Sequence, residues 1–419
     1  MDNKLIRLRQ EKMLRQEIWD TIQGDIIEGI MLEAKINDNN KSFFSQIEGH
    51  EFRVTNELIP WLSKLLQDVK DCLEFSQSLN LYINNSPHMN ASSITGNDQE
   101  PNIIRLNSPI IEKFDTEETK FILGHEIGHI LCESSRVNEL LQFVFPSEEA
   151  IPPILLNKIK VWEKLNELSA DRFGLIVCKD LKKAVSCMLK ISSGLNFSNL
   201  NVDFNSFMED NRKKIDYFRQ ENLINLSSHP INAIRIKSLE LFYNSGFYKD
   251  IGYKKDINDE NFEREINDLT DLILIKRNSE LDYHRCYFIG SAGLIMAQID
   301  SQMNNQEFYA ITNTLAEFTT FPELFLQSIN ADNISDIFIR SIEAIKGINP
   351  GESMSMLSYL IKVALCDNNV STKELEFLYK VGTETLGYSR KEIAQEISMS
   401  IGTNYRPQFV MQNVEKEGN

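Results

Sequence analysis

The spacing of apolar residues along the chain predicts a mainly helical protein with one small sheet. Apolar residues recur at helical spacing over residues 5–36 and again over residues 57–75. Residues 79–84 alternate between apolar and polar side chains and are predicted to be a strand, and residues 102–106 are predicted to be another, after a polar stretch that contains Gly96. We therefore expect an α+β fold class, mainly α with a small β-sheet.

Two longer helices are predicted after these strands. Residues 116–133 and 153–178 both keep the apolar period of an α-helix over several turns. Asp115 is predicted to be the N-cap of the first helix, because a short side chain with an oxygen acceptor can bind the free N–H groups there. Glu117 and Glu118 place negative charge in its first turn, where the helix dipole favours it.

The chain is longer than a single domain of roughly 100–200 residues, so more than one unit is expected. The sequence becomes strongly polar over residues 248–265, and helical periodicity returns after residue 282 and continues to about residue 401. We predict five parts: an N-terminal helical segment (1–76), an α+β domain (77–248), a polar linker (249–280), an all-α domain (281–405) and a flexible tail (406–419).

The net charge and the cysteine content limit the partners and the cellular location that we expect. The formal net charge is -17, and no dense run of Lys and Arg offsets it, which argues against nucleic acid and anionic membrane as partners. The six cysteines are scattered without a CxxC pair, which favours reduced thiols and a cytoplasmic location. Residues 1–10 lack the apolar region of a signal peptide, and residues 288–299 are too short to span a membrane.

One motif on the first long helix contains side chains that can bind a metal ion. The segment His125-Glu126-Ile127-Gly128-His129 places two imidazoles four residues apart, on one helix face, where they can hold a metal ion. Glu126 can direct its carboxylate to a water on that metal and act as general base. The alternative is an ordinary structural helix. With 6 histidines in the chain, a chance HExxH has a probability on the order of 1%, so we favour a catalytic metal site.

A catalytic zinc usually has three protein ligands and keeps a fourth position for water. No Gly-x-x-His follows His129, so the third ligand must come from elsewhere. Glu167 and Asp171 lie four residues apart on the second long helix. Glu167 can bind the metal while Asp171 accepts the other ring N–H of a ligating histidine. The alternative for these two residues is a solvated acidic helix face.

The HEIGH helix also contains Gly124 and Gly128. Each glycine lowers helix propensity by roughly 1 kcal/mol relative to alanine. We therefore expect another element to pack closely against this helix.

Three motifs in this order resemble the metallopeptidase family of HtpX and the CAAX prenyl proteases, a gluzincin family (peptidase family forty-eight) that carries HExxH, ExxAD and HPxxxxR. The matching segments are HEIGH at 125–129, ELSAD at 167–171 and HPINAIR at 229–235, and the resemblance covers residues 79–242. It implies a zincin-like metallopeptidase domain over residues 77–248. Two departures are the absence of a spanning helix and Ile231 in place of the family's second proline.

The resemblance also implies roles for single residues. Glu167 would bind Zn²⁺, Asp171 would support the ligands, and His229 and Arg235 would lie at the active-site rim. An imidazole at His229 can hydrogen-bond an oxyanion, and Arg235 can instead hold a carboxylate in place. A substrate-side strand would begin at Asn90 and Ala91. His50, His88 and His284 have no partners at ligand spacing, so we interpret them as structural.

The C-terminal region contains a repeat of the pattern A-x-x-D-x-x-[MV]-x-x-x-E, which resembles the TerB-like (tellurite-resistance) helical domain. Asp300 and Glu307 belong to the first copy, and Asp367 and Glu374 to the second, 67 residues later. Four carboxylates brought together can hold a hard cation such as calcium or magnesium. The alternative, which we favour, is that Asp300 and Asp367 cap the helices that follow them.

The leading hypothesis is a soluble zinc-dependent endopeptidase that hydrolyses peptide bonds in a protein substrate, with Glu126 as general base on a zinc-bound water. A second hypothesis is a metal-binding regulatory or scaffolding protein that acts through the TerB-like region. A third is a zinc hydrolase for a non-peptide amide. A protein or peptide substrate is the expected partner, and the C-terminal domain can bind a further protein.

Overall fold

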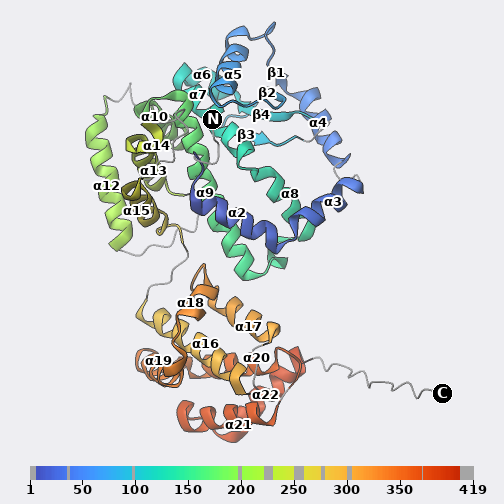
Figure 1. Cartoon of the computed structure of the whole chain (residues 1–419), viewed down its shortest axis with the longest axis vertical. Helices are drawn as coiled ribbons and strands as arrows, with labels where there is room; N and C mark the ends of the chain where they lie inside the picture. The colour runs from blue at the N-terminus through green and yellow to red at the C-terminus, as the bar shows by residue number, and fades with distance from the viewer. Residues whose placement is uncertain are drawn as a thin grey trace, which may run out of the picture. The chain divides into compact units, whose positions relative to one another are not determined.

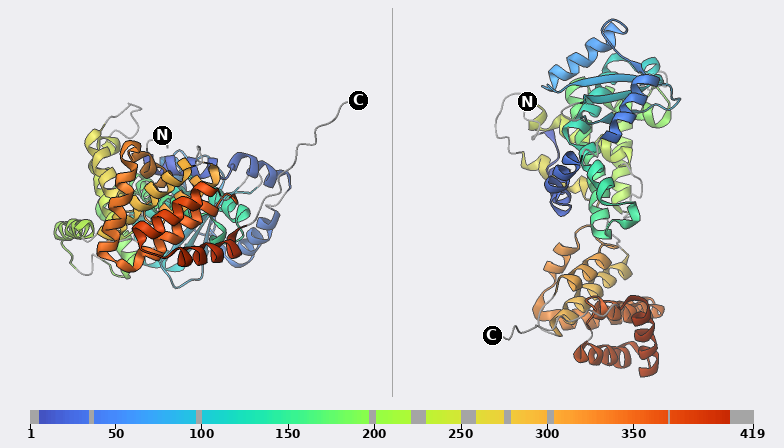
Figure 2. Two further views of the ribbon diagram at one scale, coloured as in Figure 1. Left: turned by 90° about the horizontal axis from the view of Figure 1, so that it is seen from below. Right: turned by 90° about the vertical axis from the view of Figure 1, so that its right-hand side faces the viewer.

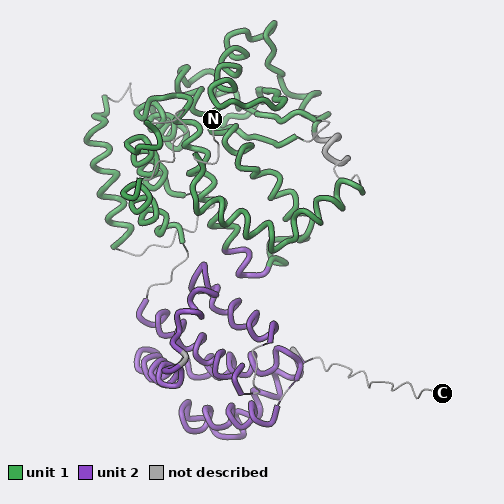
Figure 3. The backbone as a smooth tube through the Cα atoms, viewed as in Figure 1, with its two compact units in different colours: residues 1–151, 158–274 green, residues 152–157, 275–419 purple. Residues whose placement is uncertain are grey.

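A computed structural model describes residues 6–34, 38–96, 100–196, 201–220, 230–249, 259–274, 279–299, 304–369 and 371–405 (Figure 1). His229, Asp300 and the tail 406–419 lie outside the described residues. The chain divides into two compact units (Figure 3). Unit 1 comprises residues 1–151 and 158–274, and unit 2 comprises residues 152–157 and 275–419.

Helices dominate both units, and the expected α+β fold class is confirmed. The elements up to the HEIGH helix are α2 (Arg9–Thr21), α3 (Gly24–Glu33), α4 (Asp38–His50), β1 (Phe52–Arg53), α5 (Pro60–Cys72), β2 (Leu79–Asn84), β3 (Ala91–Ile94), β4 (Asn102–Asn107), α6 (Ser108–Lys113) and α7 (Thr116–Leu131). The next are α8 (Ser134–Val144), α9 (Pro153–Cys178), α10 (Leu181–Ser193), α12 (Phe204–Gln220), α13 (Asn232–Asn244), α14 (Gly246–Lys249) and α15 (Glu260–Thr270). The last are α16 (Glu280–Ile299), α17 (Asn305–Leu315), α18 (Pro322–Ser328), α19 (Ile334–Ile348), α20 (Ser353–Leu365), α21 (Thr372–Lys380) and α22 (Arg390–Asn404).

The described strands form one four-stranded sheet in the order β1-β2-β4-β3. Strands β2 and β4 pair in parallel, with Leu81 opposite Ile104. Strand β3 pairs antiparallel with β4 and stands at the edge, with Ala91 opposite Leu106. Helix α7 packs on the sheet along β3 and β4 (Figure 2). The edge strand is thereby brought beside the HEIGH helix.

Helix α7 begins where the sequence predicts. The Asp115 side chain accepts a hydrogen bond from the Glu118 N–H, and the Glu118 carboxylate accepts one from the Asp115 N–H, which is a capping box. Glu118 is also buried against α10, where its carboxylate contacts Ser186 at 2.9 Å and Lys190 at 2.5 Å. One glutamate therefore both caps α7 and joins it to α10.

Close packing explains the two glycines of α7. A Cβ atom at Gly124 would lie 3.0 Å from Gly174 Cα, and one at Gly128 would lie 2.9 Å from Ala170 Cα. Both neighbours belong to the backbone of α9, so the expected close-packing element is α9. This approach brings the turn that carries Glu167 next to the turn that carries the two histidines.

The segment expected to be a polar linker contains a helix. Helix α15 buries Phe262, Ile266 and Leu269 and packs against α13 in unit 1. Its apolar residues recur on one face, so a largely polar sequence still yields an amphipathic helix. The described part of unit 1 therefore continues to Leu274, inside the predicted 249–280 linker.

The described part of unit 2 is all α, around a core of apolar side chains from α16, α17, α19, α20, α21 and α22. The N-caps of α17 and α21 are Asn304 and Ser371, and each forms a capping box with the glutamate three residues later. The expectation that Asp300 and Asp367 cap these helices is therefore wrong. Asp367 instead accepts a hydrogen bond from the Asn369 N–H in the turn before α21. Within the described ranges, no helix has the length and apolar character that crossing a membrane requires.

Candidate metal centre

Three side chains from two helices converge in unit 1. The histidines His125 and His129 lie on α7 and Glu167 lies on α9, and each offers a ligand atom within 4.8 Å of the other two. The two Nε2 atoms are 3.0 Å apart. The Glu167 carboxylate oxygens lie 3.4 Å from His129 Nε2 and 3.8 Å from His125 Nε2.

These distances suit a zinc ion. Zinc binds imidazole nitrogen and carboxylate oxygen at about 2.1 Å, so the donor atoms of a tetrahedral site lie about 3.4 Å apart. The Nε2–Nε2 separation of 3.0 Å, and the separations of 3.4 Å and 3.8 Å from the two histidines to different oxygens of Glu167, bracket this value. Two imidazoles and one carboxylate are also a donor set that zinc prefers, and three ligands leave one position open.

The second ring nitrogen of His125 faces a buried carboxylate. Nδ1 lies 3.0 Å from Asp171 Oδ1, and the Asp171 side chain is almost fully buried. Arg235 donates two hydrogen bonds to the same carboxylate, at 2.8 Å and 2.6 Å. Burial alone would raise the pKa of Asp171, but the charge and hydrogen bonds of Arg235, together with His125, hold it below its usual range. Asp171 therefore stays ionised and can fix the His125 ring.

The second ring nitrogen of His129 faces an amide. Nδ1 lies 2.7 Å from Asn166 Oδ1, and Ser134 Oγ lies 3.0 Å from the same oxygen. Burial alone would lower the pKa of His129, but Glu167, Glu126 and Asn166 raise it to about 9 in the metal-free protein. A metal that binds there must displace this proton. Sequence reasoning assigned Asn166 no role, although it directly precedes Glu167.

The three candidate ligand residues line a cavity of about 680 Å³. Its walls include Glu126, which is 6% exposed, and residues 90–93 at the edge of the sheet. The predicted substrate-side residues Asn90 and Ala91 are therefore in the same cavity as the candidate ligands. The remaining walls come from α6, α7, α8, α9, α10 and α13.

Arg235 lies at this cavity and contacts two acidic residues of α9, Asp171 and Glu167. In addition to its two bonds to Asp171, its Nη1 atom lies 3.3 Å from Glu167 Oε2. The geometry favours the role of holding carboxylates in place. His229, the other residue expected at the rim, lies outside the described residues.

The described carboxylates of the C-terminal repeat do not form a second cluster of this kind. Glu307 and Glu374 are buried in the capping boxes of α17 and α21, and Asp367 lies 3.3 Å from Asn304 Nδ2. Within the described ranges, the only group of three His, Cys, Asp or Glu side chains with converging ligand atoms is the one at His125, His129 and Glu167. Asp300 lies outside those ranges.

Residues 58–147 match peptidase family M48. The chain is 24% identical over 251 residues to the plastoglobule-localized metallopeptidase 48, chloroplastic, of Arabidopsis thaliana, which covers 56% of this chain and 68% of the relative. It is 24% identical over 215 residues to a protease HtpX homolog of Helicobacter pylori, which covers 44% of this chain and 66% of the relative. A protease HtpX homolog of Helicobacter acinonychis is 37% identical over 75 residues, or 18% of this chain and 23% of the relative.

No solved structure matches the chain. The matched segment 58–147 contains the HEIGH helix and the whole β2-β4-β3 part of the sheet. The chain is thus similar to metallopeptidases over the part of unit 1 that holds both histidines, and this similarity to peptidase family M48 supports a metalloprotease.

Proposed function

We propose that this chain is a zinc-dependent endopeptidase that hydrolyses peptide bonds in a protein substrate. The observation that carries the proposal is the convergence of two imidazoles and one carboxylate at a cavity that an edge strand also lines. The similarity to peptidase family M48 independently favours proteolysis over hydrolysis of a non-peptide amide.

His125, His129 and Glu167 would hold the metal. When bound, zinc supplies Lewis-acid polarisation of a carbonyl and lowers the pKa of water. Asp171 and Asn166 would each accept the second ring N–H of one histidine, which leaves both Nε2 lone pairs directed at the metal.

Glu126 is the proposed general base. It follows His125 on α7, lines the cavity and is largely buried, so its carboxylate lies close to the metal ligands but out of bulk water. Its carboxylate would take a proton from the attacking water and pass that proton to the leaving amine. His229 is proposed from the family resemblance to hydrogen-bond the oxyanion.

The edge of β3 is the proposed substrate-binding element. Strand β3 has one neighbour in the described sheet, β4, so its other edge can pair with an extended peptide. Residues 91–93 of this strand, together with Asn90 just before it, line the cavity. Strand addition recognises backbone groups and needs no chain terminus, which suits cleavage inside a polypeptide.

Unit 2 is the proposed site of partner or target selection. Its described part is all α, and the capping boxes of α17 and α21 lie at equivalent positions of the sequence repeat, which supports the internal duplication behind the TerB-like interpretation. A TerB-like identity and a cytoplasmic location stay predictions from the sequence.

The test compares cells that express wild type with cells that express Glu126→Gln, by proteomics of new protein N-termini. We expect wild-type-specific termini to disappear in the variant, while purified variant still binds one zinc per chain. Glu117→Gln is the matched control, because Glu117 is on the same helix but pairs with Lys120. The same new termini in Glu126→Gln and wild type would contradict the mechanism.

A scaffolding protein would behave differently in this comparison. Its partner capture would be insensitive to Glu126→Gln and would be lost on deletion of residues 281–405. Unchanged termini together with this capture pattern would favour scaffolding over proteolysis.

A further inference from the structure

The turn between α7 and α8 contains a residue in an uncommon backbone conformation. Glu133 has a φ of 59°, in the left-handed region that residues other than glycine rarely adopt. It directly follows the C-cap of α7 and is the N-cap of α8. A left-handed residue often follows the end of a helix, and in a residue other than glycine neighbouring contacts offset its strain.

The next residue, Ser134, connects this turn to the candidate metal centre. Its Oγ atom lies 3.0 Å from the His129 carbonyl oxygen and 3.0 Å from Asn166 Oδ1. Asn166 Oδ1 is the acceptor that faces His129 Nδ1 at 2.7 Å. The turn therefore contacts, through Ser134, the amide that faces His129.

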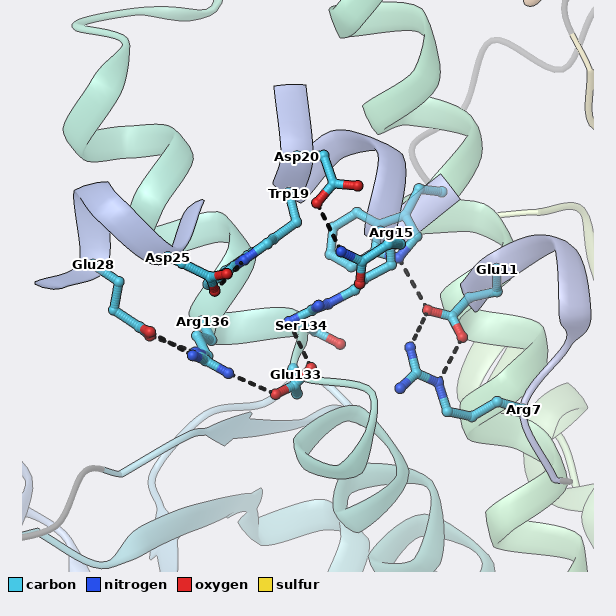
Figure 4. Close-up of polar contacts among 12 residues, drawn as sticks. Arg7, Glu11, Arg15, Trp19, Asp20, Asp25, Glu28, Glu133, Ser134 and Arg136 are labelled. Carbon is cyan, nitrogen blue, oxygen red and sulfur yellow. Dashed lines mark hydrogen bonds and ion pairs between the residues drawn. The ribbon is translucent and has the colours of Figure 1, made fainter. Parts of the chain in front are cut away.

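The N-terminal helices hold Glu133 through a group that we call the Trp19 cluster: Arg15, Trp19, Glu28, Glu133 and Arg136. Glu133 lies 2.6 Å from Arg15 of α2 and 2.8 Å from Arg136 of α8. Arg136 also pairs with Glu28 of α3 (Figure 4). Both guanidinium groups stack on the Trp19 ring, at 4.6 Å and 4.7 Å from its centre. The Trp19 cluster thus contains two positive and two negative side chains around one aromatic ring.

Helix α2 also binds the helix that carries Glu167. Glu11 is fully buried and accepts two hydrogen bonds from Arg7 and one, at 3.0 Å, from the Trp162 ring N–H of α9. The Leu8 N–H donates to Ser169 Oγ of α9 at 3.1 Å. Trp162 lines the cavity one turn before Asn166. The N-terminal segment thus contacts α9, which carries Glu167, and the turn that follows α7.

We propose that the N-terminal helices α2 and α3 brace the metal site, and that Glu133 is a positioning residue for His129. The inference rests on the proposed function, since it takes His129 as a metal ligand. The contacts run from Arg15 and Arg136 to Glu133, and from the adjoining Ser134 through Asn166 to the imidazole. Loss of the Glu133 carboxylate would free the turn and weaken the hold of Ser134 on the amide.

The test uses the full-length chain with Glu133→Asn. Asparagine tolerates the left-handed region, so this change removes the carboxylate without adding backbone strain. We expect Zn²⁺ affinity, measured by competition with a chromophoric chelator, to fall about 10-fold, the lower end for residues that orient metal ligands. We also expect kcat to fall while KM is unchanged, because the residue touches no substrate.

Glu74→Asn is the matched control. Glu74 is the other described glutamate with a left-handed backbone, at φ 52° after α5, and it is exposed. Its zinc affinity and kcat should equal those of wild type. An equal loss in both variants would overturn the inference, because it would reflect a general effect of the substitution.

A double-mutant cycle tests whether Glu133 acts on the metal site through Ser134. If Glu133 acts through Ser134, then Glu133→Asn and Ser134→Ala combined should reduce zinc affinity no more than the larger single loss. If the double variant instead loses zinc affinity by the product of the two single losses, Glu133 does not act through Ser134. If Glu133→Asn fails to fold by circular dichroism, Arg15→Gln replaces it, and its zinc affinity should fall several-fold.

His129→Ala separates this inference from the proposed function. If His129→Ala binds zinc as wild type does, the metal site itself is wrong and the inference fails with it. If His129→Ala loses zinc while Glu133→Asn keeps wild-type affinity, the metal site stands and the brace alone is overturned.

Discussion

His129 Nδ1 lies 2.7 Å from Oδ1 of Asn166, the residue that directly precedes the proposed ligand Glu167. A single turn of α9 therefore presents the proposed ligand carboxylate and an amide oxygen that faces the imidazole of His129. Asp171, one turn further along α9, lies 3.0 Å from Nδ1 of His125 as an ion-pair partner. Both proposed histidine ligands are thus oriented from one helix, so the placement of α9 against α7 controls the whole donor set.

Asn166→Ala should weaken zinc binding by about 10–100-fold, because it removes the acceptor that fixes the His129 ring. Asn166→Asp keeps an acceptor oxygen and should lose less. Competition with a chromophoric chelator measures the zinc affinity of both variants. Ser192→Ala is the control, since Ser192 lines the same cavity but bonds the carbonyl of Leu189 in its own helix. Wild-type affinity in Asn166→Ala would show that the amide does not orient the ligand.

Arg235→Met should destabilise the metal-free protein by about 3–5 kcal/mol, because it leaves the buried Asp171 carboxylate without its charged partner. Lys214→Met is the control for an exposed ion pair on α12, where Lys214 is 55% and its partner Asp210 59% exposed, and should cost about 1 kcal/mol or less. Urea unfolding in the presence of a chelator measures both free energies without a contribution from zinc. Equal losses of unfolding free energy in the two variants would show that burial of the Arg235–Asp171 pair does not strengthen its contribution to stability.

Gly128→Ala should destabilise the protein by about 1–3 kcal/mol, because its Cβ atom would lie 2.9 Å from the α9 backbone at Ala170 and would push the two helices apart. Zinc affinity should fall with it, since Glu167 would move away from the histidines. The control is Gly29→Ala in α3, where the new Cβ atom meets nothing within 4 Å. That change should stabilise by about 0.5–1 kcal/mol. A neutral Gly128→Ala would mean that the helices can separate freely.

Asp115→Asn should reveal a pH-dependent part of the stability. Burial alone would raise the pKa of Asp115, but the hydrogen bonds from Lys183 and from the Glu118 N–H hold it below its usual range. A carboxylate with a lowered folded pKa stabilises above its unfolded pKa of about 3.9 and loses that contribution as pH falls through the folded value. Asparagine also caps helices, so the change removes mainly the charge.

We therefore expect wild type to exceed Asp115→Asn in unfolding free energy by about 0.3–1 kcal/mol at pH 7, the usual size of a charge effect at a helix N-terminus. The two proteins should converge as the pH falls below about 4. Urea unfolding at several pH values measures this difference. A constant difference at every pH would contradict a charge effect.

Local pattern determined the elements that carry the chemistry. The capping box at Asp115, the apolar period of residues 116–133 and 153–178, and the alternation of residues 79–84 depend only on neighbours in the chain, and α7, α9 and β2 appear where these signals place them. Spacing of four residues also placed His125 and His129 on one helix face, because helix geometry is the same in every protein.

Only the tertiary structure decided which side chains meet across elements. The contacts of Asn166 with His129 and Ser134, the two bonds of Arg235 to Asp171, and the position of β3 at the cavity all join residues far apart in sequence. The same holds for the Trp19 cluster, which joins α2 and α3 to the turn after α7.

The physical reason is that periodicity specifies a face of a helix but not its partner, its offset or its distance. Here Gly124 and Gly128 let the backbones of α7 and α9 approach, and that approach sets Glu167 within reach of both imidazoles. The sequence by itself therefore determined two ligand-bearing helices and the chemistry of their side chains, and the packing of those helices decided that the side chains form one centre.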